Sequence, residues 1–152
     1  MSTARDIFAR KGGNPKNEYP RYMVVGECKW LEFWYDEGAF TRVHISEFPS
    51  VTISFSYGDL FPTLSARVND RKECRSQVYT LEEMVAIIRK YGLPQAWNVE
   101  GRLGPERYVE AQIWDDEPLA RHLTVQKSPD APTASGIGPV IGCVRLPGRK
   151  SS

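Results

Sequence analysis

The chain has 152 residues and a mass of 17.3 kDa, the size of a single domain that can bury a core without disulfides or metals. Hydrophobic residues make up 41% of it and charged residues 26%, which is typical of a folded globular protein and argues against a disordered chain. The formal net charge of +1 excludes a global attraction to nucleic acid or to anionic membrane.

The N-terminal half of the chain is predicted to be a short helix followed by strands. Residues 3–10 have the composition of a helix that ends at Gly12. After this helix, β-branched and aromatic residues alternate with polar ones, which is the pattern of half-buried strands. Four strands are predicted, over residues 21–25, 30–35, 40–45 and 51–57. Because the last three are joined by short connections, we expect them to form an antiparallel meander.

The last of these strands ends at Tyr57, Gly58 and Asp59, and Pro62 follows. Glycine followed by aspartate, with a proline close behind, is typical of a turn. We therefore interpret Asp59 as a turn residue. The alternative is a catalytic carboxylate, since active-site carboxylates often lie where a strand ends.

The main helix is predicted over residues 81–91. Thr80 and Glu83 have the spacing of a capping box, and apolar residues recur on one face of the helix. Gly92 and Pro94 end it. We expect this helix to pack on the apolar face of the sheet.

A strand over residues 108–114 and a short helix over 117–123 complete the predicted elements. The sequence after residue 126 is rich in Pro, Gly and Ser and has no helical or strand period. We therefore expect three parts: an N-terminal arm over 1–18, one domain over 19–126, and a flexible or loosely docked tail over 127–152. The predicted fold class is α+β, with an antiparallel sheet of four or five strands, one main helix on one face and short terminal helices.

Two turns set the expected register of the meander. A three-residue loop over 36–38 that ends in glycine pairs Glu32 with Arg42, which are oppositely charged. In the second hairpin, the same reasoning pairs His44 with Thr52. One face of the sheet then carries a mixture of aromatic, charged and hydroxyl side chains, namely Trp30, Glu32, Trp34, Arg42, His44, Thr52, Ser54 and Ser56.

This mixed face is the main functional signal in the sequence. A sheet face that is only exposed to solvent does not need two tryptophans. A buried face does not tolerate three ionisable groups unless they are paired. We interpret the face as a contact surface, since Trp and Arg supply much of the energy of interfaces. The alternative is that the N-terminal segment or the tail covers it as a second core.

The sequence therefore predicts a non-catalytic protein-binding module of the inhibitor, immunity or adaptor type. Its predicted binding residues are Trp30, Glu32, Trp34, Arg42 and His44. The expected partner is another protein or a second copy of the chain, as in a homodimer, and the net charge of −3 over residues 27–47 favours a basic surface. Nucleic acid is not expected, because Glu32 and Arg42 cancel and no phosphate-binding loop is present.

A small hydrolase or transferase is the alternative function, with His44 acting beside Glu32 or Asp59. A Ser/His/carboxylate arrangement with Ser54 is possible by parity, but a mid-strand serine lacks the free backbone donors of an oxyanion hole. The two histidines have no metal-binding spacing, so neither a metal nor a cofactor is predicted.

Three widely spaced cysteines, Cys28, Cys74 and Cys143, form no CxxC pair, which argues against a disulfide framework and a structural zinc site. The sequence also contains no apolar stretch of signal-peptide or membrane-span length. From these features we expect a cytoplasmic protein with no membrane association.

Overall fold

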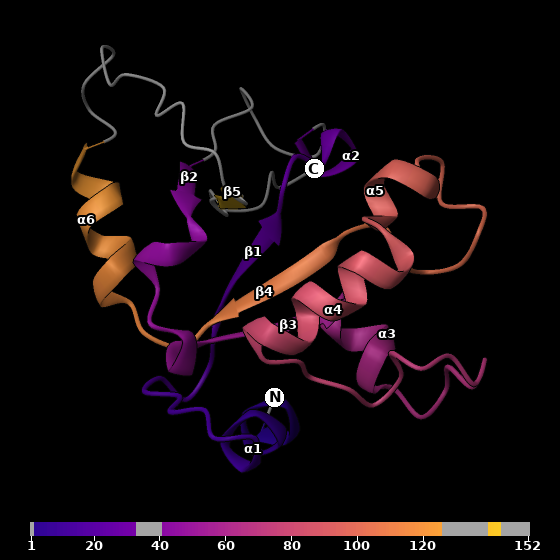
Figure 1. Ribbon diagram of the computed structural model, residues 1–152, viewed down its shortest axis with the longest axis horizontal. Coiled ribbons are helices and arrows are strands. Elements are labelled where there is room, and N and C mark those ends of the chain that lie inside the picture. The colour runs from indigo at the N-terminus through magenta and orange to yellow at the C-terminus, as the bar shows by residue number, and fades with distance from the viewer. Residues whose placement is uncertain (1, 33–40, 126–139, 144–152) are drawn as a thin grey trace, which may run out of the picture.

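The computed structural model describes residues 2–32, 41–125 and 140–143 of the chain. Its fold is α+β: an antiparallel sheet carries a main helix on one face, and short helices surround it (Figure 1). This agrees with the predicted fold class. Within the described residues, no helix is both long enough and apolar enough to cross a membrane.

The sheet has the strand order β2-β5-β1-β4-β3, and every neighbouring pair is antiparallel. Three strands, β1, β4 and β3, form the part on which the main helix packs, and β5 and β2 extend the sheet beyond β1 (Figure 1). The strands are β1 Arg21–Val25, β2 Thr41–His44, β3 Ile53–Tyr57, β4 Val109–Ile113 and β5 Val140–Cys143.

The main helix is α4, and it begins as the sequence predicts. The Thr80 hydroxyl accepts a hydrogen bond from the backbone N–H of Glu83, and the Glu83 carboxylate accepts one from the N–H of Thr80 at 2.9 Å. The α-helices are α1 Ser2–Arg10, α2 Lys29–Glu32, α3 Leu60–Leu64, α4 Leu81–Tyr91, α5 Pro94–Trp97 and α6 Glu117–Val125. Short 3-10 turns cover Ile45–Glu47 and Ser50–Thr52.

Both faces of the sheet are covered. On one face, Met84 and Ile87 of α4 pack against strand residues such as Phe55. On the other face, α1 and α3 cover a second apolar cluster, in which the Phe8 ring stacks on Trp114 with centroids 6.5 Å apart. This double coverage explains why all five residues of β3 and all five of β4 are buried.

The predicted meander is wrong. Residues 29–32 form the short helix α2 where a strand was expected, and β2 and β3 lie at opposite edges of the sheet. Two 3-10 turns between β2 and β3 carry the chain away from β2, so the two strands cannot form a hairpin. The predicted turn over 36–38 and Trp34 lie outside the described residues.

Because the strands pair differently from the prediction, the residues that lie opposite one another also differ. His44 lies opposite Val140, where Thr52 was expected, and Arg42 lies opposite Gly142. Residues 140–143, predicted to belong to a loosely docked tail, form β5 between β1 and β2. Their short apolar run has the composition of a strand, but the surrounding Pro, Gly and Ser residues obscure it.

Candidate functional site

The described residues of the predicted mixed face do not lie on a common face. Trp30 is on the helix α2, whereas Arg42 and His44 are on the edge strand β2. The opposite edge strand, β3, carries Ser54. Four strand spacings separate the two edges, a distance of roughly 19 Å. The side chain of Glu32 lies outside the described part of the chain.

The serine side chains of β3 are buried, whereas the predicted mixed face was expected to be partly exposed to solvent. Ser54 and Ser56 are both 0% exposed. The Ser54 hydroxyl donates to the Gln112 side chain at 2.9 Å and accepts from the Trp114 indole N–H at 2.8 Å. Because these bonds occupy Ser54 and β2 is distant, the Ser/His/carboxylate arrangement is ruled out.

Asp59 begins α3, in agreement with its interpretation as a turn residue. Its carboxylate accepts from the backbone N–H of Phe61 at 2.8 Å and from the Tyr108 hydroxyl at 3.3 Å. Glu110 lies nearby, and burial, followed by the negative charge of Asp59, raises the pKa of Glu110 to about 8. The Glu110 carboxyl also accepts from the Gln112 amide at 3.1 Å. This buried network holds a neutral carboxyl inside the fold at neutral pH.

The other side chains that could take part in catalysis or metal binding are hydrogen-bonded or ion-paired within the protein. His44 Nδ1 lies 2.6 Å from the Ser46 hydroxyl, and His122 pairs with Glu47. Asp115 accepts from Lys16 and from the N–H of Glu117, at the start of α6. Over residues 2–32, 41–125 and 140–143, no cluster of three potential metal ligands is present.

Trp30 of α2 forms a stack with two further side chains, Tyr108, which is buried, and Arg107. The Trp30 ring stacks on Tyr108 with centroids 6.5 Å apart, and the Arg107 guanidinium lies 4.2 Å from the Trp30 centroid. Arg107 also donates to the backbone oxygen of Val99 at 2.9 Å. These contacts hold the Trp30 ring in place while it remains 39% exposed.

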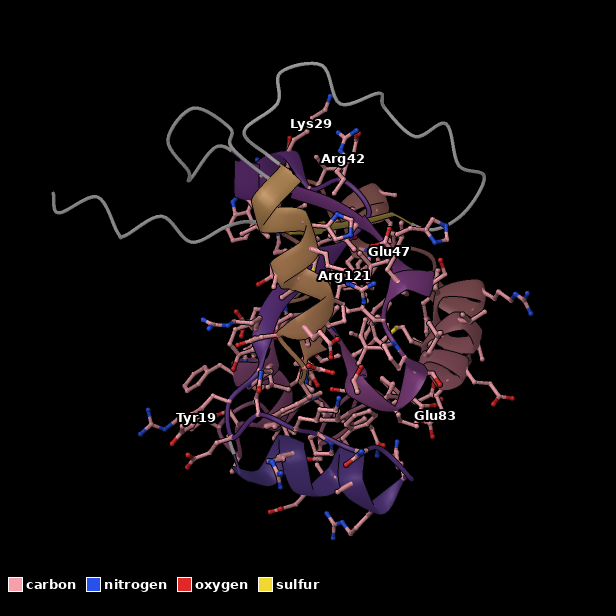
Figure 2. All side chains as sticks on the ribbon, turned by 90° about the vertical axis from the view of Figure 1, so that its left-hand side faces the viewer. Tyr19, Lys29, Arg42, Glu47, Glu83 and Arg121 are labelled. Atoms are coloured by element: carbon pink, nitrogen blue, oxygen red, sulfur yellow. The ribbon has the colours of Figure 1, made fainter. Side chains whose placement is uncertain are left out.

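The stack borders a groove between α2 and α5 with a volume of about 390 Å³. We call it the Trp30 groove, and its lining is Glu27, Cys28, Lys29, Trp30, Gln95, Ala96, Val99 and Arg107. Glu27 also forms an ion pair with Arg42 at 2.8 Å. Figure 2 shows Lys29 and Arg42 at one end of the molecule and Tyr19 towards the other.

Exposed apolar side chains are frequent on α2 and over residues 91–103, the region that contributes Trp30 and Val99 to the groove. Among the residues whose exposure the structure describes, nine large hydrophobic side chains are exposed, and five of them lie on α2 or between residues 91 and 103. Those five are Trp30, Tyr91, Trp97, Val99 and Leu103. Clustered exposed apolar groups of this kind are typical of interaction surfaces.

A second cavity, of about 250 Å³, lies on the other side of α5. We call it the aromatic cavity, and its lining is Tyr57, Lys72, Glu73, Cys74, Tyr79, Ile87, Tyr91, Trp97 and Glu106. Burial raises the pKa of the Cys74 thiol, so the sulfur is not an activated nucleophile. The Tyr79 hydroxyl is buried and has no hydrogen-bond partner among the described residues.

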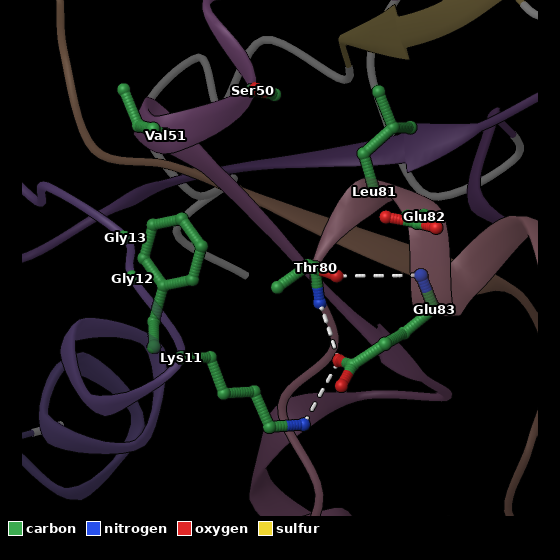
Figure 3. A pocket seen from close by; sticks show the side chains of 10 residues that line it. Lys11, Gly12, Gly13, Ser50, Val51, Thr80, Leu81, Glu82 and Glu83 are labelled. Carbon is green, nitrogen blue, oxygen red and sulfur yellow. Dashed lines mark hydrogen bonds and ion pairs between the residues drawn. The ribbon is translucent and has the colours of Figure 1, made fainter.

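A third cavity, of about 480 Å³, lies between the end of α1 and the start of α4 (Figure 3). Three polar residues of its lining, Lys11, Thr80 and Glu83, interact with one another at the N-terminus of α4. The Lys11 ammonium lies 2.9 Å from the Glu83 carboxylate, which also accepts from the N–H of Thr80 (Figure 3). We interpret this cavity as a structural junction between the two helices.

Comparison of the chain with protein-family models, with curated proteins and with solved structures gives no match. We therefore infer the function from the geometry of the Trp30 groove and of the aromatic cavity. Trp30 is among the binding residues predicted from the sequence, whereas Arg107 and Tyr108 are not. Trp30 can be singled out from its residue type. Arg107 and Tyr108 lie more than 70 residues later in the chain, and no local sequence pattern connects these two residues to Trp30.

Proposed function

We propose that the protein is a non-catalytic protein-binding module of the inhibitor, immunity or adaptor type and that it binds its partner through the Trp30 groove. The observation that carries this proposal is the stack of Arg107, Trp30 and Tyr108 at the edge of a concave surface. Tryptophan, tyrosine and arginine are the residue types that most often dominate binding energy at interfaces.

The stack is preorganised for binding. Arg107 is fixed by its bond to Val99, and Trp30 is fixed between Arg107 and Tyr108. A side chain that is already ordered loses little conformational entropy when a partner binds, so more of its contact energy contributes to affinity.

The groove also has the mixed character of a protein interface. Its lining combines Trp30, Ala96 and Val99 with the charged residues Glu27, Lys29 and Arg107, which supply charges of both signs. An apolar centre with a polar rim is the usual anatomy of interfaces between separately folded proteins. We infer that the partner is another protein that inserts an apolar or aromatic side chain between α2 and α5.

Site-specific photo-crosslinking tests this proposal. A benzoylphenylalanine replaces Val99, which is 64% exposed beside the stack, and in a control chain it replaces Tyr19, which is equally exposed at the other end of the molecule. In an extract of the source cells, we expect the Val99 probe to form one adduct of discrete mass with another protein. The Tyr19 probe is expected not to form that adduct.

Truncation of the stack should then abolish the adduct. Trp30→Ala and Arg107→Ala, each in the Val99-probe chain, are expected to weaken the complex at least about tenfold, and Tyr19→Ala is expected to leave it unchanged. An adduct with the mass of two copies of this chain would contradict the proposed partner class. An adduct that is insensitive to Trp30→Ala would contradict the proposed surface.

A further inference from the structure

We propose that the aromatic cavity is a binding site for a small, planar, uncharged aromatic molecule. The site is separate from the Trp30 groove, although α5 contributes Trp97 to the cavity and Ala96 to the groove. Ligand sites are typically concave, mostly apolar and lined by aromatic residues together with a few polar groups. A volume of about 250 Å³ restricts the ligand to one or two fused rings.

The aromatic side chains of the lining present mainly ring carbon to the cavity, because the polar atoms of Tyr57, Trp97 and Tyr91 are hydrogen-bonded within the protein. The Tyr57 hydroxyl donates to the backbone oxygen of Gly92 at 2.7 Å and accepts from the Trp97 indole N–H at 3.1 Å. The Tyr91 hydroxyl donates to Glu73. The Tyr79 hydroxyl has no hydrogen-bond partner among the described residues and is buried from solvent.

These bonds also fix the ring positions. Tyr57 and Tyr91 have centroids 6.0 Å apart and planes inclined by 52°, and both rings line the cavity. Aromatic rings attract one another in such tilted and offset arrangements. The cavity therefore offers a planar ligand preformed aromatic walls.

The charges around the cavity argue against a charged ligand. Glu106 is buried, and it is paired with Lys72 at 2.7 Å and with Arg75. Glu73 is paired with Lys90 at 2.8 Å. Aromatic cages bind ammonium ions when their own charge favours a cation, but here each carboxylate of the lining is already neutralised by a lysine or an arginine. An uncharged ligand is the class that fits.

Titration of the purified full-length chain with defined probes tests the proposal. The uncharged planar probes are indole and toluene, and the comparison probes are phenyltrimethylammonium and benzoate. The readout is the ¹⁵N-labelled N–H signals of the protein: the indole N–H of Trp97, which lies in the wall of the cavity, and the backbone amides of the other lining residues, which also report binding in a variant that lacks Trp97. We expect saturable shifts of the Trp97 signal with indole and toluene, and none with the two charged probes.

Variants separate this site from the Trp30 groove. Trp97→Ala removes one wall and is expected to weaken indole binding about tenfold, whereas Trp30→Ala is expected to leave it unchanged. Tyr91→Ala is a second wall variant in case Trp97→Ala disturbs the fold, which circular dichroism and thermal unfolding will report.

The proposal fails if neither uncharged probe binds saturably or if a charged probe binds more tightly than indole. It also fails if both wall variants, while folded, bind indole as tightly as the wild type. None of these outcomes bears on the proposed protein partner, because the titration contains only the chain itself and the partner test depends on Trp30 and Arg107.

Discussion

At the scale of single residues, Glu110 is a buried carboxyl group with a strongly raised pKa. It is 6% exposed on β4, and its surroundings raise the pKa from an ordinary value of 4.5 to about 8. The first cause is burial, which disfavours the charged form, and the second is the negative charge of Asp59. The backbone N–H of Leu60 and the Gln112 and Tyr108 side chains offset part of this effect through hydrogen bonds.

This shift predicts a pH-dependent stability. Between about pH 4.5 and pH 8 the folded chain binds a proton at Glu110 that the unfolded chain has released, so the free energy of unfolding should fall as pH rises through this range. Glu110→Gln keeps the shape but cannot ionise. We expect it to be close to wild type in stability at pH 4.5 and more stable by about 4 kcal/mol at pH 8. Urea unfolding at both pH values measures this, and equal stability differences at the two values would contradict it.

At the scale of elements, those with strong local signals were predicted correctly from the sequence. The helix α4 was predicted from its capping box, and the strands β1, β3 and β4 from their composition. The helix α2 was not predicted, because four residues are too few to show a helical period. Its sequence, "KWLE", was therefore read as part of a strand.

The pairing of the strands was not predictable in the same way. The preference for neighbouring strands to pair favoured a β2–β3 hairpin, but the partner of β2 is β5, about 100 residues further along the chain. A local pattern carries no information about such a distant partner. The shared face was not predictable for the same reason: Trp30 contacts Tyr108 and Arg107, which lie far from it in the sequence.

The capping box of α4 gives a prediction at this scale. Thr80→Ala removes the hydroxyl that accepts from the N–H of Glu83 and is expected to lower the free energy of unfolding by about 1 kcal/mol. Thr80→Ser keeps a hydroxyl and is expected to retain most of the stability. The test is thermal and chemical unfolding of the two variants beside the wild type, and equal losses for both would show that the cap contributes little.

At the scale of the whole molecule, the two edge strands have different supports. β3 is held by β4, by the helix α4 and by the pairing of Phe55 with Tyr79. β2 is joined to the rest of the sheet through β5, which pairs with β1 on its other side. Arg42 of β2 forms an ion pair with Glu27, which lines the Trp30 groove. The position of this ion pair therefore depends on the pairing of β2 with β5.

This dependence predicts that one backbone change in β5 will affect both the sheet and the groove. Ile141 pairs with Val25 on one side and with Val43 on the other. Ile141→Pro removes a backbone donor from this interior strand and is expected to cost about 3 kcal/mol or more. Ile141→Thr keeps the donor and the β-branch, so we expect a smaller loss. Hydrogen exchange should show faster exchange in β2 for the proline variant, with α4 and β3 less affected, because their contacts do not pass through β5. Equal protection of β2 in the two variants would contradict the central position of β5 in the sheet.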